Sequence, residues 1–195
     1  MQLRPGLVLE YKINIEFLAS FLHKKYAGKV LYTILNVDNS KLTYKVSTDE
    51  NLLLARDVSE IDIEKIVLMK IEPGVYEHDL SQNFGSNFPI IPKKYIDVIN
   101  SKGMSQVNVD NLFKNFPLNV TRFDVGITDA VCDAGSIKSY KFSIVGKKDF
   151  INLEVNMFFD VESGVLVRLL EKGKLMLIKL NIDNQLSKIS YSNIR

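Results

Sequence analysis

The sequence of 195 residues predicts an α+β fold: a strongly curved, mostly antiparallel β-sheet like half a barrel, with two or three short helices on its concave side. Three observations lead to this prediction. Apolar and polar residues alternate over most of the chain, which is the period of a half-buried strand. In the last third of the chain, only short turn-like stretches separate these alternating segments, which favours antiparallel pairing of neighbouring strands. No helix of crossover length interrupts these runs, so a parallel sheet is not expected.

The first third of the chain is predicted to be mostly strand. Residues 7–15 alternate with one polar face, and residues 29–47 predict a hairpin that turns around Asp38 to Ser40. Between them the period changes. Apolar residues in 16–28 recur at helical spacing and Gly28 could close a helix, so a short helix is expected there.

The middle of the chain is less regular. Residues 51–56 predict a short strand, whereas 57–71 fit both strand alternation and a helix that begins with a capping box, and both alternatives stay open. An irregular or helical insertion follows at about 73–116. It should hold one helix between Pro92 and Gly103 and a helical turn from Asp110. We expect a single domain over 1–195, because the apolar residues of this insertion need burial.

The last third predicts an antiparallel meander. Three consecutive strands are expected over Phe150–Ile182, with turns at VESG (161–164) and EKGK (171–174). Gly164 is the residue best able to adopt positive φ in the first turn. Asp160 and Glu162 would then lie at a water-exposed hairpin tip. There they shape a turn and do not form a catalytic carboxylate pair.

Two stretches carry a resemblance to a known family. The PGLVLEYKI strand and the FFDVESGVLVRL hairpin, with its D-x-x-x-G-x-L turn at Asp160, Gly164 and Leu166, resemble the curved half-barrel of bacterial lipoprotein carriers and similar archaeal β-rich proteins. The resemblance implies a curved antiparallel sheet that wraps short helices and encloses an apolar cavity. It assigns no binding residue in this chain.

Composition and motifs exclude most function classes. The net charge is +2, and the only histidines, His23 and His78, form no metal-ligand spacing, so no metal or cofactor is expected. Cys132 is a lone cysteine without a paired histidine motif, and the phosphate-loop, dinucleotide and nucleophile-elbow signatures are absent. No apolar run is long enough to span a bilayer or to act as a secretory signal. A cytoplasmic protein is expected, or an extracellular one if a signal peptide has been removed.

These exclusions favour a non-enzymatic binding module that holds an apolar small molecule or docks a protein partner. Its expected contact residues lie on a proline-rich segment that could act as a lid, and they are Phe84, Phe88, Ile90, Ile91 and Tyr95. Single-stranded nucleic-acid binding through lysine pairs beside aromatics is one alternative, with Lys24, Lys25, Tyr26, Lys93, Lys94, Lys147 and Lys148 as its residues. An enzyme without recognisable motifs is another alternative, and the oligomeric state stays open.

Overall fold

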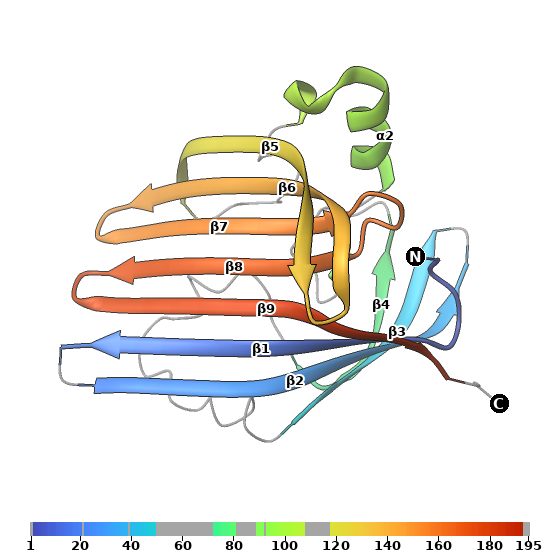
Figure 1. Cartoon of the computed structure of the whole chain (residues 1–195), viewed down its shortest axis with the longest axis horizontal. Helices are drawn as coiled ribbons and strands as arrows, with labels where there is room; N and C mark the ends of the chain where they lie inside the picture. Colours follow the sequence, from blue (N-terminus) through green and yellow to red (C-terminus); the bar gives the residue numbers. More distant parts are fainter. Residues whose placement is uncertain are drawn as a thin grey trace.

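The computed structural model describes residues 2–20, 22–38, 40–49, 72–80, 89–91, 93–107 and 118–192. Within these ranges the strands form one antiparallel sheet of nine strands, in the order β4-β3-β2-β1-β9-β8-β7-β6-β5 (Figure 1). The strands are β1 (Leu7–Ala19), β2 (Leu22–Val37), β3 (Lys41–Thr48), β4 (Gly74–Asp79), β5 (Asn119–Cys132), β6 (Gly135–Lys148), β7 (Ile151–Asp160), β8 (Leu166–Leu175) and β9 (Ile178–Tyr191).

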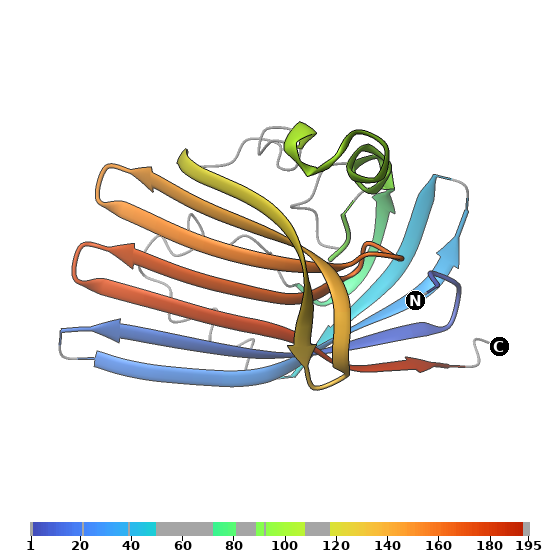
Figure 2. The ribbon, with the colours of Figure 1, turned by 45° about the horizontal axis from the view of Figure 1, so that its top comes forward.

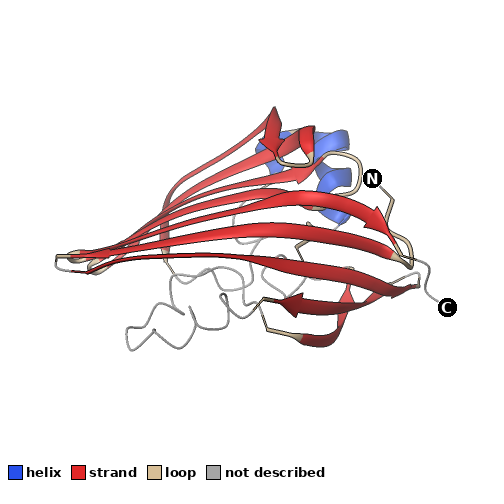
Figure 3. Cartoon of the chain, turned by 60° about the horizontal axis from the view of Figure 1, so that its bottom comes forward, coloured by secondary structure: helices blue, strands red, loops and turns tan. Residues whose placement is uncertain are grey.

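The sheet joins two halves of the chain. Strands β1 to β4 form one half and the meander β5 to β9 forms the other, and they meet where residues 7–18 of β1 pair with β9. The sheet is strongly curved, and the described strands β4 and β5 at its two edges do not pair with each other (Figures 2 and 3). The result is an open half-barrel, as the sequence predicts.

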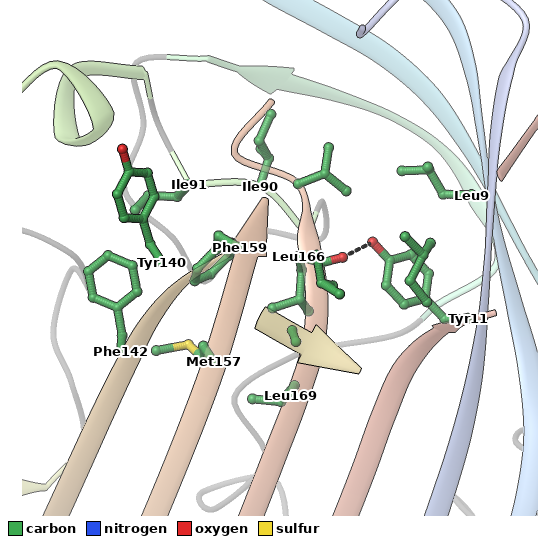
Figure 4. Packing of buried hydrophobic residues seen from close by; sticks show 14 of the residues in the cluster. Leu9, Tyr11, Ile90, Ile91, Tyr140, Phe142, Met157, Phe159, Leu166 and Leu169 are labelled. Atoms are coloured by element: carbon green, nitrogen blue, oxygen red, sulfur yellow. Dashed lines mark hydrogen bonds between the residues drawn. The ribbon is translucent and has the colours of Figure 1, made fainter. Parts of the chain in front are cut away.

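The core lies on the concave face, where alternate residues of the strands point inward. Along the register, Phe142 of β6, Met157 of β7 and Leu169 of β8 stand side by side and are at most 2% exposed (Figure 4). Burying a side chain of this size stabilises a fold by roughly 1.5–3 kcal/mol. This row and the parallel rows beside it hold the sheet in its curved form.

The helix α2 (Lys93–Lys102) packs over one end of this core and buries Tyr95, Ile96 and Ile99. The Tyr140 hydroxyl of β6 donates a hydrogen bond of 2.8 Å to Asn100 Oδ1 on the helix. A 3₁₀ turn at Met104–Gln106 follows. The expected helix between Pro92 and Gly103 is therefore confirmed.

The segment 89–91, just before α2, lies against the turn between β7 and β8. Ile90 forms an isolated antiparallel bridge with Val165, the Ile91 amide donates to the Gly164 carbonyl at 2.9 Å, and the Leu166 amide donates to the Pro89 carbonyl at 2.8 Å. These backbone bonds fix the segment at the turn, so its two isoleucines are core residues.

The far end of the β5–β6 hairpin folds back over the middle of the sheet. The Ala134 amide donates to the Leu186 carbonyl of β9, and Lys12 of β1 forms an ion pair with Asp133. Arg168 Nη1 of β8 donates to the Val131 carbonyl at 3.2 Å. The hairpin end therefore contacts three strands that are distant from it in the sequence.

Four expectations are wrong. Residues 16–28 form the end of β1 and the start of β2, not a helix, because both faces of this hairpin carry apolar residues and blur the strand period. β8 runs through the expected EKGK turn, and the chain reverses at Met176–Leu177 instead. Asp160 is only 6% exposed, not water-exposed. The described residues hold one α-helix where two or three were expected.

Other expectations are confirmed or fall outside the described residues. The hairpin over 29–47, the turn at 161–164 and the three strands of Phe150–Ile182 are confirmed. The predictions for 51–56, for 57–71 and for a helical turn from Asp110 to Phe116 lie outside the described residues.

Candidate functional site

Three hairpins end at the same side of the sheet, on the left of Figure 1. The β1–β2 turn lies between Ala19 and Leu22, the β6–β7 turn is Asp149–Phe150, and the β8–β9 turn is Met176–Leu177. We call this side of the sheet the tip end. Two of these turns carry large apolar residues in place of the asparagine or glycine that two-residue hairpin turns favour.

The apolar concave face continues from the core to the tip end. Leu153 and Leu180 are at most 3% exposed, and Ile151, Leu175 and Ile178, the inward-facing residues that adjoin the turns, are partly buried. The turn residues beyond them are exposed: Phe150 to 66%, Met176 to 60% and Leu177 to 78%. Apolar side chains on β7, β8 and β9 thus continue from the sheet interior to the exposed turns.

One amide interrupts the apolar concave face. Asn184 of β9 lies between Leu169 of β8 and Ile13 of β1 and is 2% exposed. Its Oδ1 atom accepts no hydrogen bond from any residue that the structure describes. An unpaired buried acceptor is costly, by about 1–3 kcal/mol, so such a group is rare without a functional reason.

A buried carboxyl group lies near this amide. Glu171 of β8 is 1% exposed and faces Ile182 of β9, which places it diagonally from Asn184 on the same face. Two polar groups therefore share one region of a surface that is otherwise lined by aliphatic and aromatic side chains.

Four tyrosines cross the other half of the concave face, one on each of β1, β2, β3 and β4. Ring centroids are 5.6 Å apart for Tyr11 and Tyr32, 6.2 Å for Tyr32 and Tyr44, and 5.7 Å for Tyr44 and Tyr76. Burial raises the pKa of Tyr32 and of Tyr44 well above the usual range, so both phenols stay neutral. The Tyr11 hydroxyl donates to the Leu166 carbonyl at 2.7 Å, which ties β1 to β8 across β9. The four tyrosine rings therefore contribute to the packing of the core and do not form a binding site.

The opposite, convex face carries a depression of about 260 Å³ on β1, β7, β8 and β9, lined in part by Asn14, Asn156 and Asp183. Its charges are matched. Glu16 contacts Lys25 at 3.0 Å and His23 at 2.8 Å, and these hydrogen bonds lower the pKa of Glu16 to about 2. Arg168 donates two bonds to Asp183, at 3.0 and 2.8 Å. Because these acidic and basic side chains pair with one another, we interpret the region as a surface ion-pair network and not as a binding site.

No side chains on the described part of the chain form a metal site, since no cluster of three or more ligand-type residues occurs there. Burial raises the pKa of the Cys132 thiol, which therefore stays protonated at neutral pH. Burial also lowers the pKa of His78. Neither group has the activation that nucleophilic or acid–base catalysis needs.

The structure describes three of the five residues that the sequence proposed for an apolar site. Phe84 and Phe88 lie outside the described residues. Ile90, Ile91 and Tyr95 are 4%, 1% and 6% exposed and belong to the core at the α2 end of the molecule.

The three lysine pairs do not lie together. Lys24, Lys25 and Tyr26 near the start of β2 lie at the tip end together with Lys147 and Lys148, but Lys93 and Lys94 belong to α2 (Figure 1). On β2, Lys24 and Tyr26 face the concave side and Lys25 the convex side. Two of the three pairs therefore share one end of the sheet.

Sequence reasoning missed three residues that the structure places in prominent positions: Asn184, Met176 and Leu177. A visible signal existed for the last two, because an apolar pair stands where strand alternation breaks in KLMLIKL. Asn184 falls on the inward position of β9, which only the register reveals.

Helices long and apolar enough to cross a bilayer do not occur among the described residues. The chain matches no protein-family model and no curated protein sequence.

Proposed function

We propose that the protein is a non-enzymatic binding module that holds a long apolar ligand with a hydrogen-bond-donating polar end against its concave face. The observation that carries the proposal is the buried Asn184 Oδ1 atom, an acceptor without a donor among the described residues, within an apolar surface. Ligand sites of this kind are mostly apolar with a few polar groups that fix the ligand's orientation.

The apolar part of the ligand would lie along the strands towards the tip end. Ile151, Leu175 and Ile178 are partly buried and connect the core to the exposed turns. Contact with a ligand chain would remove these side chains and the chain itself from water, at roughly 25 cal/mol per Å² of apolar surface.

The polar end of the ligand would meet Asn184. An amide oxygen accepts hydrogen bonds, so the ligand should donate one, as the hydroxyl group of a fatty alcohol or of a monoacylglycerol does. A ligand without a donor at this end would leave the acceptor unpaired and bind more weakly.

The test compares two probes: dodecan-1-ol, which has a hydroxyl hydrogen-bond donor, and dodecyl methyl ether, which has none. We expect the parent protein to bind the alcohol about fivefold more tightly, since one buried hydrogen bond contributes about 1 kcal/mol. Asn184→Leu should abolish this preference. Asn152→Leu, on the exposed convex side of β7, is the matched control and should keep it.

The same variant separates a binding role from a structural role. If Asn184 is held for a ligand, Asn184→Leu should raise the free energy of unfolding by about 1 kcal/mol in ligand-free protein, because an unpaired acceptor is removed. Equal affinity for alcohol and ether in the parent protein, or binding of neither, would contradict the proposal.

A second variant pair tests the path of the ligand. Leu175→Glu places a charge on the concave side of β8, whereas Lys174→Glu changes the neighbouring convex side. Only the first should weaken the binding of dodecan-1-ol.

A further inference from the structure

We propose that the tip end docks on an anionic membrane surface, through a set of seven residues that we call the tip surface. Its members are Phe150, Met176 and Leu177 in the turns and Lys147, Lys148, Lys174 and Lys179 in the strands beside them. This interaction is independent of the concave-face ligand and is carried by different residues.

The apolar part of the tip surface is the first line of support. Phe150, Met176 and Leu177 are 66%, 60% and 78% exposed, which makes them three of the most exposed large apolar residues in the described chain. Two adjacent hairpins present them at the same end of the sheet. Exposed apolar residues that gather in one place mark interaction sites, whereas scattered ones need no explanation.

The backbone of the β8–β9 turn strengthens this point. Met176 has a φ of 51°, in the left-handed region that asparagine and glycine adopt more readily than methionine. A turn that only had to reverse the chain would gain stability from Asn-Gly. Met-Leu at this strained and exposed position points to a role for these side chains outside the fold.

The lysines supply the charge. Lys147, Asn152, Lys174 and Lys179 are neighbours in the register and form one row across β6, β7, β8 and β9, two residues away from the turn residues. All three lysines of this row are exposed, and none forms an ion pair with a described residue. Asp149 is the only carboxylate within the two turns.

These positions match the layers of a bilayer surface. A strand rises about 3.3 Å per residue, so the lysine row would stand a few ångströms above the apolar turn residues. With the turns inserted below the headgroups, the row lies at the level of the lipid phosphates. Lysines near an anionic surface each contribute about fivefold in binding.

The reporter for insertion is a single tryptophan, because the chain contains none. Leu177→Trp should show a blue-shifted emission on vesicles of 70% phosphatidylcholine and 30% phosphatidylglycerol, and no shift on phosphatidylcholine alone. Val131→Trp is the matched control, because Val131 is 66% exposed near the end of β5, where the hairpin folds back over the middle of the sheet and away from the tip end, and its emission should not shift.

Flotation of the protein with the same vesicles tests both parts of the tip surface. M176N/L177G should reduce binding at least tenfold while raising the melting temperature, because the turn becomes a favoured one. K147E/K174E/K179E should reduce binding to anionic vesicles on the order of 100-fold. K45E/K102E/K138E changes the net charge equally with exposed lysines elsewhere and should retain binding.

Three results would overturn the proposal. The first is the absence of flotation with anionic vesicles at low salt. The second is an equal loss in the control triple variant, which would show that only net charge matters. The third is binding of a single-stranded oligonucleotide that K147E/K174E/K179E abolishes and M176N/L177G leaves intact, without vesicle binding, which would assign the lysines to nucleic acid.

Discussion

Gly164 holds the most constrained position in the turn between β7 and β8. Its φ is 72°, and a Cβ atom there would lie 2.9 Å from the Ile91 carbonyl oxygen and 2.9 Å from Ile96 Cδ1. The glycine therefore serves two purposes, since it permits the left-handed backbone and lets segment 89–91 and α2 approach the turn. The sequence indicated the first purpose, but the second depends on contacts between distant parts of the chain.

Gly164→Ala should accordingly lower the free energy of unfolding by 2 kcal/mol or more (~1 from backbone strain, the rest from displaced neighbours). Gly126→Ala on β5 is the control, because nothing lies within 4 Å of its added Cβ atom. It should be neutral or slightly stabilising. Urea denaturation of both variants measures the difference, and equal effects would contradict the close approach.

We expect the stability of the protein to depend on pH through His78. It is 2% exposed on β4, and burial lowers its pKa below the ordinary value of 6.5, although Asp79 opposes the shift. The unfolded chain therefore binds a proton more readily than the folded chain as the pH falls through 6.5. The contribution of neutral His78 is present above that pH and is lost below it.

We expect the free energy of unfolding to fall between pH 7 and pH 5, and to fall less steeply in His78→Gln, which cannot take up the proton. Urea denaturation at four pH values measures both slopes. Identical slopes for parent and variant would show that His78 titrates alike in the folded and unfolded chains.

The β7–β8 turn shows at the scale of an element how two similar carboxylates differ. Asp160 is 6% exposed and accepts hydrogen bonds from the Ser163 hydroxyl, the Ser163 amide at 3.2 Å and the Glu162 amide at 3.4 Å. Glu162 is exposed. Asp160 thus organises the turn, which fits the structural role that the sequence predicted for it, although burial was not foreseen.

Asp160→Ala should cost about 1–3 kcal/mol of stability because it leaves turn amides without their acceptor, whereas Glu162→Ala should stay within about 0.5 kcal/mol. Thermal melts of the two variants measure this. Neither change should alter alcohol binding by the folded protein, because both residues lie at the opposite end of β7 from the tip end.

The elements that the sequence misplaced share one cause. Strand alternation and turn residues located the hairpin over 29–47, the helix α2 and the 161–164 turn, because each has glycine, proline or aspartate at its ends. The β1–β2 and β8–β9 hairpins lack such residues at their turns, and Gly173, which suggested a turn, is buried within β8. At the tip end, apolar residues stand where turn-forming residues would be expected. The sequence pattern therefore failed to predict the β8–β9 hairpin, and the same apolar residues belong to the candidate docking surface.

At the scale of the whole molecule, the pairing of β1 with β9 is the step that makes one sheet from two half-sheets. Residues more than 160 positions apart meet there, such as Ile13 and Asn184. Alternation within each strand predicts the strands but not this partner, because any apolar strand could complete the edge of β9. The position of Asn184 on the concave face, and with it the candidate ligand site, follows from that register and was therefore not predictable from local sequence.

The single-domain prediction can be tested by dividing the chain between residues 117 and 118. Each fragment would carry a half-sheet with an unpaired edge strand, β1 or β9, and half of the apolar concave face, so neither should be stable and monomeric alone. Co-expressed fragments should associate one to one through the β1–β9 pairing.

Ile13→Asp, at a residue 2% exposed beside β9, should prevent association, whereas Val75→Asp on the same fragment, at a residue 62% exposed on β4, should not. Size-exclusion chromatography with light scattering measures the outcome. Two fragments that fold separately and remain apart would show two domains, because a single domain loses the core that both halves build together.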